Sequence, residues 1–172
     1  MNNLQPQLNP GTYLSSLRFT AGLNASPYGS VDTTVMRFEG SGAPEGTGLS
    51  QVTTAENGTV ITVEKPGMYA VQLRGGNGAA TPLITGVTVN ADAFALTNPP
   101  NFGTAGTRDV DITEGPDAAG NAGSCALTSM VAVTAADIAA GTGGAQLRVH
   151  GSGGSIVVGT ASLQVRRMGS IF

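Results

Sequence analysis

The 172-residue sequence predicts an all-β fold, an antiparallel sandwich of two β-sheets, and three observations lead to it. Glycine is abundant, at 26 residues, whereas charged residues make up only 11%, so the chain lacks the composition of long helices. Short apolar runs with a period of two recur between glycine-rich turns, as they do in sandwiches. Hydrophobic residues make up 40% of the chain, which is enough to bury one substantial core.

Residues 1–13 are predicted to form an extended N-terminal arm, and residues 14–172 a single sandwich domain. The arm has no alternating apolar pattern and contains Pro6 and Pro10 among asparagines and glutamines. It has no basic start followed by an apolar run, so we expect no signal peptide. No stretch reaches the apolar length that a membrane-spanning helix requires, so we expect no membrane partner.

The strands are predicted from runs that alternate or are rich in β-branched residues. Glycine-rich residues 40–48, 75–78 and 151–154 are predicted to be turns. Residues 135–141 could form one helical turn, but we expect a loop. The strands are expected at residues 14–20, 31–39, 51–54, 59–64, 68–74, 82–89, 108–113, 125–134, 145–150, 155–158 and 161–167, with 94–96 as an apolar continuation.

Residues 61–73, ITVEKPGMYAVQL, predict a corner between two strands. Pro66 has the φ that the second residue of a β-turn needs, and Gly67 tolerates the positive φ of a type II turn. A type II turn twists the wrong way for a tight hairpin, so we expect the chain to pass into the facing sheet. Tyr69, Val71 and Leu73 alternate and are expected to face the core.

The charge and the cysteine content limit the classes of function that the chain could have. The net charge is −3, and the basic residues are scattered, so no basic patch points to a nucleic-acid partner. Sparse charge suggests that much of the surface contacts other protein. Cys125 is the only cysteine, so no disulfide can form within the chain. We expect its side chain to be buried and to pack as a small hydrophobic group.

No set of residues predicts an active site, and we expect neither catalysis nor a cofactor. His150 is the only histidine, lies opposite Leu147 and Val149 in a predicted strand, and is expected to face solvent or another subunit. No G-x-S-x-G motif accompanies it. Asp109 and Asp111 would share one strand face, and their oxygens suit calcium. The alternative is a solvated face, because the regular spacing of a calcium loop is absent.

Several runs resemble C1q/TNF-like jelly rolls. Residues 59–73, TVITVEKPGMYAVQL, resemble the place where a strand meets a Pro-Gly corner and an aromatic-bearing strand follows. Residues 129–141, SMVAVTAADIAAG, are similar to the family's apolar strand and the loop after it, although Asp137 does not follow a glycine here. AQLRVHGS (145–152) and GTASLQVRRMG (159–169) resemble the next and closing strands. The resemblance covers residues 51–169.

The glycine- and alanine-rich filling makes the chain resemble bacteriophage virion proteins of this fold more than secreted modules. The resemblance implies a non-enzymatic homotrimer, a capsid decoration (cement) protein that binds the major capsid protein from outside and is made in the host bacterial cytoplasm. The alternatives are a receptor- or glycan-binding knob of a phage fibre and an uncharacterised enzyme. Partner contacts are expected in the arm, at Leu4, Pro6, Leu8, Pro10 and Tyr13.

Overall fold

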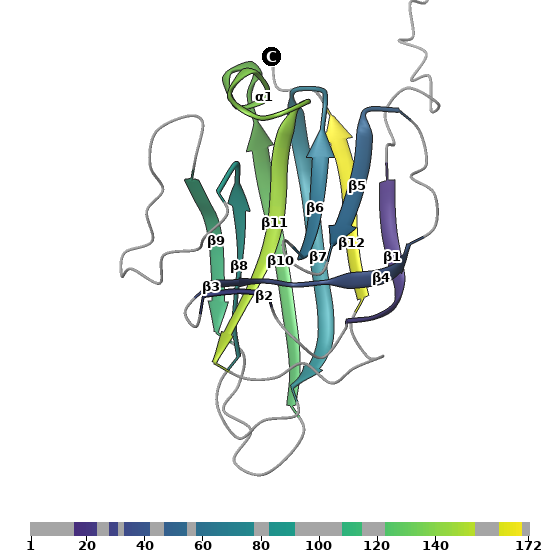
Figure 1. Cartoon of the computed structure of the whole chain (residues 1–172), viewed down its shortest axis with the longest axis vertical. Helices are drawn as coiled ribbons and strands as arrows, with labels where there is room; N and C mark the ends of the chain where they lie inside the picture. The colour runs from purple at the N-terminus through teal and green to yellow at the C-terminus, as the bar shows by residue number, and fades with distance from the viewer. Residues whose placement is uncertain are drawn as a thin grey trace, which may run out of the picture.

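A computed structural model describes residues 16–23, 28–30, 33–41, 47–54, 58–77, 83–91, 108–114, 123–153 and 162–169. These residues form twelve strands in two facing antiparallel sheets, with one short helix at one end (Figure 1). The elements are β1 (Ser16–Leu23), β2 (Tyr28–Ser30), β3 (Thr33–Val35), β4 (Phe38–Ser41), β5 (Leu49–Thr54), β6 (Gly58–Val63), β7 (Gly67–Asn77), β8 (Leu83–Val89), β9 (Arg108–Glu114), β10 (Gly123–Val133), α1 (Ala135–Ala140), β11 (Ala145–Gly153) and β12 (Ser162–Gly169).

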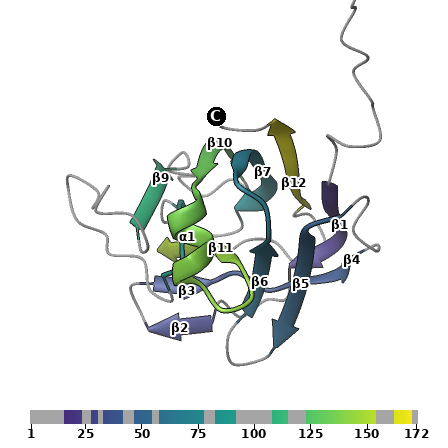
Figure 2. The ribbon, with the colours of Figure 1, turned by 90° about the horizontal axis from the view of Figure 1, so that it is seen from above.

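The first sheet, sheet A, has the strand order β10-β7-β12-β1-β4. In the second, sheet B, β11 pairs with β8 along one edge, and β9 pairs with β8. Along its other edge β11 pairs first with β6 and then with β3, and β5 and β2 lie outside these two strands. Figure 2 shows the two layers from above. The strands β11 and β12, near the end of the sequence, are therefore interior strands of the two sheets.

The core lies between the sheets and is built from alternate residues of the strands. Tyr69, Val71 and Leu73 are at most 1% exposed, as the sequence predicted. The Tyr69 hydroxyl donates a hydrogen bond of 2.6 Å to the Lys65 carbonyl, so the one polar atom of this side chain has an acceptor. The other core residues are Met36, Phe38, Leu49, Ile61, Val63, Val87, Val89, Leu127, Val131, Val133, Ala145, Leu147, Val149, Leu163 and Val165.

The predicted strands are confirmed wherever the structure describes them, with two corrections. Residues 31–39 contain two strands, because the chain leaves β3 in sheet B and enters β4 in sheet A. Residues 75–77 and 151–153, which were predicted to be turns, are strand residues, and so are Gly40 and Ser41 at the start of the predicted turn 40–48. Gly75 and Gly76 pair with Cys125 and Ser124 of β10, so ladder hydrogen bonds outweigh the local preference of glycine for turns. The predictions at 94–96 and 155–158 lie outside the described residues.

The expected loop at 135–141 begins instead with the helix α1. Thr134 is its N-cap, and its hydroxyl accepts a hydrogen bond from the Asp137 amide. The Asp137 carboxylate in turn accepts a hydrogen bond of 2.7 Å from the Thr134 amide. This reciprocal capping box satisfies amides at the start of the helix, which explains why six residues suffice. The signal was present in the sequence as Thr-x-x-Asp.

The corner after β6 joins sheet B to sheet A as predicted, but it is not a type II turn. Gly67 is already the first residue of β7 and is not among the described residues with positive φ, which are Gly48, Gly58, Asn90, Gly143 and Gly144. Glycine is required here for a different reason. A Cβ at this position would lie 2.3 Å from the Gly169 carbonyl oxygen of β12.

The segment between β3 and β4 is inserted where β11 and β6 separate. The Met36 amide donates to the Val149 carbonyl at 2.8 Å, and the Met36 carbonyl accepts from the Thr59 amide at 3.0 Å. The buried hydroxyl of Thr59 accepts a hydrogen bond of 2.8 Å from the Phe38 amide. It also lies 2.9 Å from the Thr53 hydroxyl. The crossing chain is thus anchored to sheet B by main-chain and threonine contacts.

We expect Thr59→Val to lower the free energy of unfolding by about 1–3 kcal/mol, because the replacement has the same shape but cannot accept the Phe38 hydrogen bond in a buried site. Urea denaturation measures the change. Thr62→Val, in the same strand at a half-buried position, is the control and should change stability by less than about 0.5 kcal/mol. Equal effects of the two substitutions would contradict the anchoring role.

Candidate functional site

The outward face of sheet A, on the side away from the core, combines three adjacent strands in register. Gln72 of β7 lies between Thr128 of β10 and Gln164 of β12. Among the described side chains of this face on β7, β10 and β12, only Arg74 and Arg166 carry charge. We define this face by Met68, Ala70, Gln72, Arg74, Ala126, Thr128, Met130, Ala132, Ser162, Gln164, Arg166 and Met168, all exposed or half-buried.

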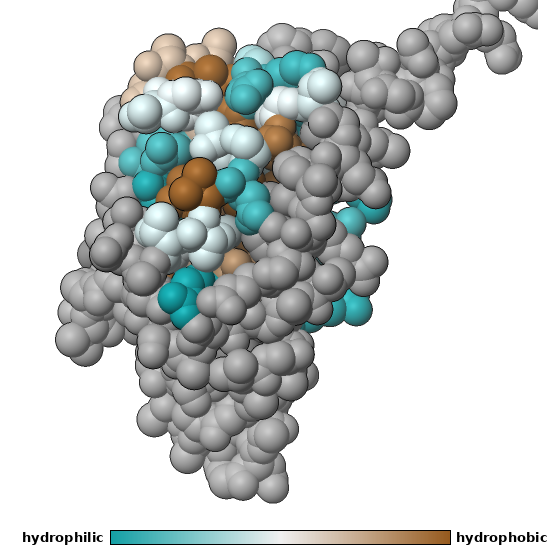
Figure 3. Space-filling model, turned by 45° about the vertical axis from the view of Figure 1, so that its right-hand side comes forward, coloured by the Kyte–Doolittle hydropathy of each residue, from teal (hydrophilic) through white to brown (hydrophobic). Residues whose placement is uncertain are grey.

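One end of this face is apolar. Met130 is 51% exposed and Met168 50% exposed, and Ala70 pairs with Met130 across the strands. Val52 of β5, at 63%, is the other large hydrophobic residue exposed in the described part of the chain. Among the described residues visible in Figure 3, hydrophobic areas are small and separated by polar ones. Met130 and Met168 lie on the two strands that flank β7, so sheet A carries two of the three large exposed hydrophobic residues of the described chain.

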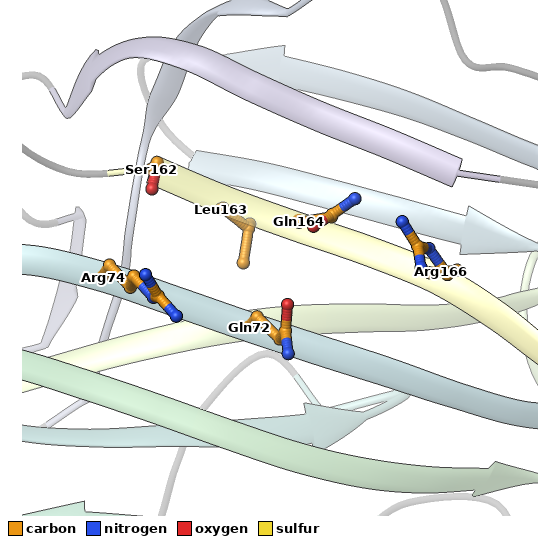
Figure 4. Close-up of a pocket in the computed structure, with 6 residues that line it drawn as sticks. All are labelled: Gln72, Arg74, Ser162, Leu163, Gln164 and Arg166. Atoms are coloured by element: carbon orange, nitrogen blue, oxygen red, sulfur yellow. The ribbon is translucent and has the colours of Figure 1, made fainter.

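A polar hollow of about 380 Å³ lies between β7 and β12. It extends from the level of Arg74 to that of Arg166, which is opposite Ala70 and so next to the apolar end. Its lining offers two guanidinium groups, two amides and a hydroxyl, and includes no carboxylate from the described residues. Figure 4 shows Gln72 and Gln164 between the two arginines, and Leu163 belongs to the core beneath. Arg74 and Arg166 are four positions apart in the ladder, or about 13 Å. The lining residues are Gln72, Arg74, Ser162, Leu163, Gln164 and Arg166.

The described lining of this hollow includes none of the residues predicted to bind partners or calcium. Leu4, Pro6, Leu8, Pro10 and Tyr13 lie outside the described residues. The backbones of Asp109 and Asp111 lie in β9, where a register shift opposite Val87 and Thr88 interrupts the alternation. Calcium at this strand stays a prediction. The described residues contain no group of three His, Cys, Asp or Glu that could hold a metal.

His150 was expected to face solvent or a subunit, and this was wrong, because it is only 1% exposed within one chain. Alternation correctly places it opposite Leu147 and Val149, but Arg148 on the same side of the strand is also buried. Alternation assigns a side of a sheet and does not indicate whether that side is covered.

The ring of His150 is held neutral. Its Nε2 lies 2.8 Å from the Thr88 hydroxyl, which donates to the Ala91 carbonyl at 3.1 Å. Since that hydroxyl has one hydrogen, Nε2 must be the donor to Thr88. Burial, assisted by the positive charge of Arg148, lowers the pKa of His150 to about 3. A buried neutral imidazole of this kind is structural.

The two facing sheets, joined by chain that crosses repeatedly between them, define a jelly-roll sandwich. No family model and no curated protein matches the sequence. Among solved structures, murine APRIL at pH 5.0 has a TM-score of 0.60 at 12% identity, covering 90% of this chain and 98% of that chain. Eiger TNF from S. frugiperda gives 0.54 at 12%, covering 93% and 96%. PRD1 vertex protein P5 gives 0.53 at 13%, covering 91% and 97%.

These similarities confirm the predicted fold: the chain is a TNF-like jelly roll, and it resembles a phage vertex protein as well as TNF proteins. No helix in the described residues is long and apolar enough to cross a membrane.

The polar hollow was not predicted from the sequence. Alternation with Val71 and Leu73 places Gln72 and Arg74 on one face of β7, and Gln164 and Arg166 share one face of β12. Only the register of β7 with β12 brings the two groups together, since these strands are about ninety residues apart in the chain.

Proposed function

We propose that this protein is a non-enzymatic structural protein of a virion, a homotrimer that binds the outside of the major capsid shell and stabilises it. The observation that carries the proposal is the outward face of β7, β10 and β12, whose described side chains include exposed methionines and two arginines but no Lys, Asp or Glu. Methionine and arginine are enriched in protein interfaces, whereas Lys, Asp and Glu are depleted. The likeness to a phage vertex protein supports a place in a virion.

The stabilising mechanism is mass action. A protein that binds the assembled shell but not the separate subunits shifts the equilibrium toward the shell. Each trimer would bridge neighbouring capsid subunits, so no reaction chemistry is required. A closed symmetric assembly also covers apolar surface without leaving a free copy of the same patch.

The oligomeric state is testable by sedimentation, and we expect a trimer at micromolar concentration. Met130→Asp should raise the trimer dissociation constant at least tenfold, because it places a charge in the apolar end of the face. Val52→Asp, at an exposed hydrophobic position in sheet B, is the control and should leave the trimer intact. A monomeric parent protein would contradict the proposal.

Attachment to the capsid is proposed to use the N-terminal arm, through Leu4, Pro6, Leu8, Pro10 and Tyr13. Extended segments can order along a partner and contact a large surface, and prolines reduce the entropy lost in doing so. Deleting residues 2–11 should leave the melting temperature and the trimer unchanged but weaken binding to particles that lack the protein. Normal coating by the truncated protein would move the contact to the sandwich itself.

The alternative function is a receptor- or glycan-binding knob of a fibre, which the ligand-sized polar hollow would suit. The described residues of its lining include no aromatic side chain on which a sugar could stack. Quantitative mass spectrometry of purified particles separates the two functions. A decoration protein should be present in hundreds of copies, and a fibre knob in few.

A further inference from the structure

The apolar end of the outward face of sheet A exposes methionine side chains on two strands. Met130 of β10 is 51% exposed, and Met168 of β12 is 50% exposed. The strand between them, β7, contributes the half-buried side chains of Met68 and Ala70. These four residues, which we call the methionine patch, carry no charge. Methionine adapts its shape to an apolar partner and makes favourable contacts with aromatic rings, so the patch fits an apolar segment with an aromatic residue.

A segment of this composition follows β12 directly. Residues 170–172 are Ser, Ile and Phe, and they come after Gly169, the last residue of that strand. They lie outside the described residues, but their starting point is fixed, because Gly169 pairs with Met68 of the methionine patch. Burying the isoleucine and phenylalanine side chains of this segment would be favourable by the usual hydrophobic free energy of large apolar groups. The segment therefore starts beside a surface that suits it.

The segment of the same copy is badly placed to cover the far side of the patch. Gly169 is opposite Met68, and Met68 is opposite Ala132, so Met130 lies two strands across and two residues back along β10. With strands about 4.8 Å apart and a rise of about 3.4 Å per residue, the two Cα atoms are about 12 Å apart. Three fully extended residues span at most about 11 Å. The segment would also have to turn back across β7 at Gly169, whereas the segment of a neighbouring copy has neither restriction.

We propose that the methionine patch of one copy binds Ile171 and Phe172 of a neighbouring copy. This inference rests on the trimer proposed above and names a segment that covers part of its interface. The arrangement closes around a threefold axis, since each copy donates one segment and accepts one. The phenyl ring would pack against the methionine sulfur atoms, above the small side chain of Ala70, which lies opposite Met130.

Disulfide trapping tests which copy supplies the segment. Cys125, the only cysteine, is first replaced by alanine. Met130→Cys and Phe172→Cys are then made in two separate chains, which are co-expressed and mildly oxidised. We expect a disulfide between positions 130 and 172, which here can form only between two copies, identified by mass spectrometry of the linked peptides. Co-expression of Val52→Cys with Phe172→Cys is the control, because Val52 is exposed in the other sheet, and it should give at least tenfold less of the link.

Loss of the apolar side chains gives a second, independent measurement. Ile171→Ser with Phe172→Ser should raise the trimer dissociation constant at least tenfold, measured by sedimentation over a concentration series. Ile171→Leu with Phe172→Leu keeps the apolar character and should stay within threefold of the parent. Far-UV circular dichroism and melting identify any variant that does not fold.

Three outcomes overturn the inference. The serine variant could stay within threefold of the parent, or co-expression could give no more of the 130–172 link than the control. A single chain with both Met130→Cys and Phe172→Cys could also form the link only within one copy, which would place the segment on its own sheet. In all three cases the parent trimer, and with it the proposed function, still stands. A monomeric parent would instead remove the proposed function first.

Discussion

Gly67→Val should be among the most destabilising single substitutions in this chain, with an expected loss of about 3 kcal/mol in the free energy of unfolding. The Cβ would lie 2.3 Å from the Gly169 carbonyl oxygen, which is a main-chain atom and cannot rotate away. Both strands are held by further pairing, β7 to β10 and β12 to β1, so neither can move alone. Denaturation in urea gives the value.

Gly169→Ala is the control for this contact. Its Cβ would meet nothing within 4 Å, so the change in stability should stay below about 0.5 kcal/mol, although the residue faces Gly67 across the same approach. Gly67→Ala should lose a large part of the free energy of unfolding that Gly67→Val loses, because the clash already involves Cβ. An alanine variant as stable as the parent would show that the strands do not approach so closely.

Acid should destabilise the protein through His150. In the folded chain its pKa is lowered to about 3, whereas the unfolded chain has the ordinary value of 6.5. Above pH 6.5 both states are neutral and the residue has no effect. Below it the unfolded state binds a proton that the folded state refuses, so the free energy of unfolding falls by up to about 1.4 kcal/mol per pH unit.

The comparison with His150→Gln isolates this effect. His150 is the only histidine, so between pH 6.5 and 5 no other side chain titrates near its ordinary value. The melting temperature of the parent should fall across this range, while that of the glutamine variant should be flat, whatever its absolute value. Parallel curves for the two proteins would mean that the imidazole is hydrated and accepts a proton in the folded state.

Local sequence patterns correctly predicted which side chains are buried where a strand packs one of its faces against the core. Alternation placed Tyr69, Val71 and Leu73 inside, and the same period of two puts Leu127, Ser129, Val131 and Val133 together on the buried side of β10. The passage from one sheet to the other near Pro66 also followed from the residues. These features depend on neighbours in the chain, and therefore a single sequence can predict them.

The sequence did not predict features that depend on pairing between strands far apart in the chain. The extended conformation of Gly75 and Gly76 is imposed by β10, and the requirement for glycine at position 67 arises from an atom about a hundred residues away. The burial of His150 and the existence of the hollow have the same origin. The helix α1 is different, since its capping box is local and a search for Thr-x-x-Asp would have found it.

The interior positions of β11 and β12 have a consequence for biosynthesis. In sheet B, β11 joins β8 to β6 and β3, and in sheet A, β12 joins β7 to β1. Until residues 145–169 leave the ribosome, these earlier strands lack the partner that lies between them. The nascent chain must therefore carry unpaired strand edges and an open core through most of translation, and neither sheet can close before synthesis reaches its last strands. Folding that waits for such remote partners is slow and exposes the chain to aggregation. We therefore expect the yield of native protein during expression to depend more on the supply of chaperones than on the stability of the folded protein.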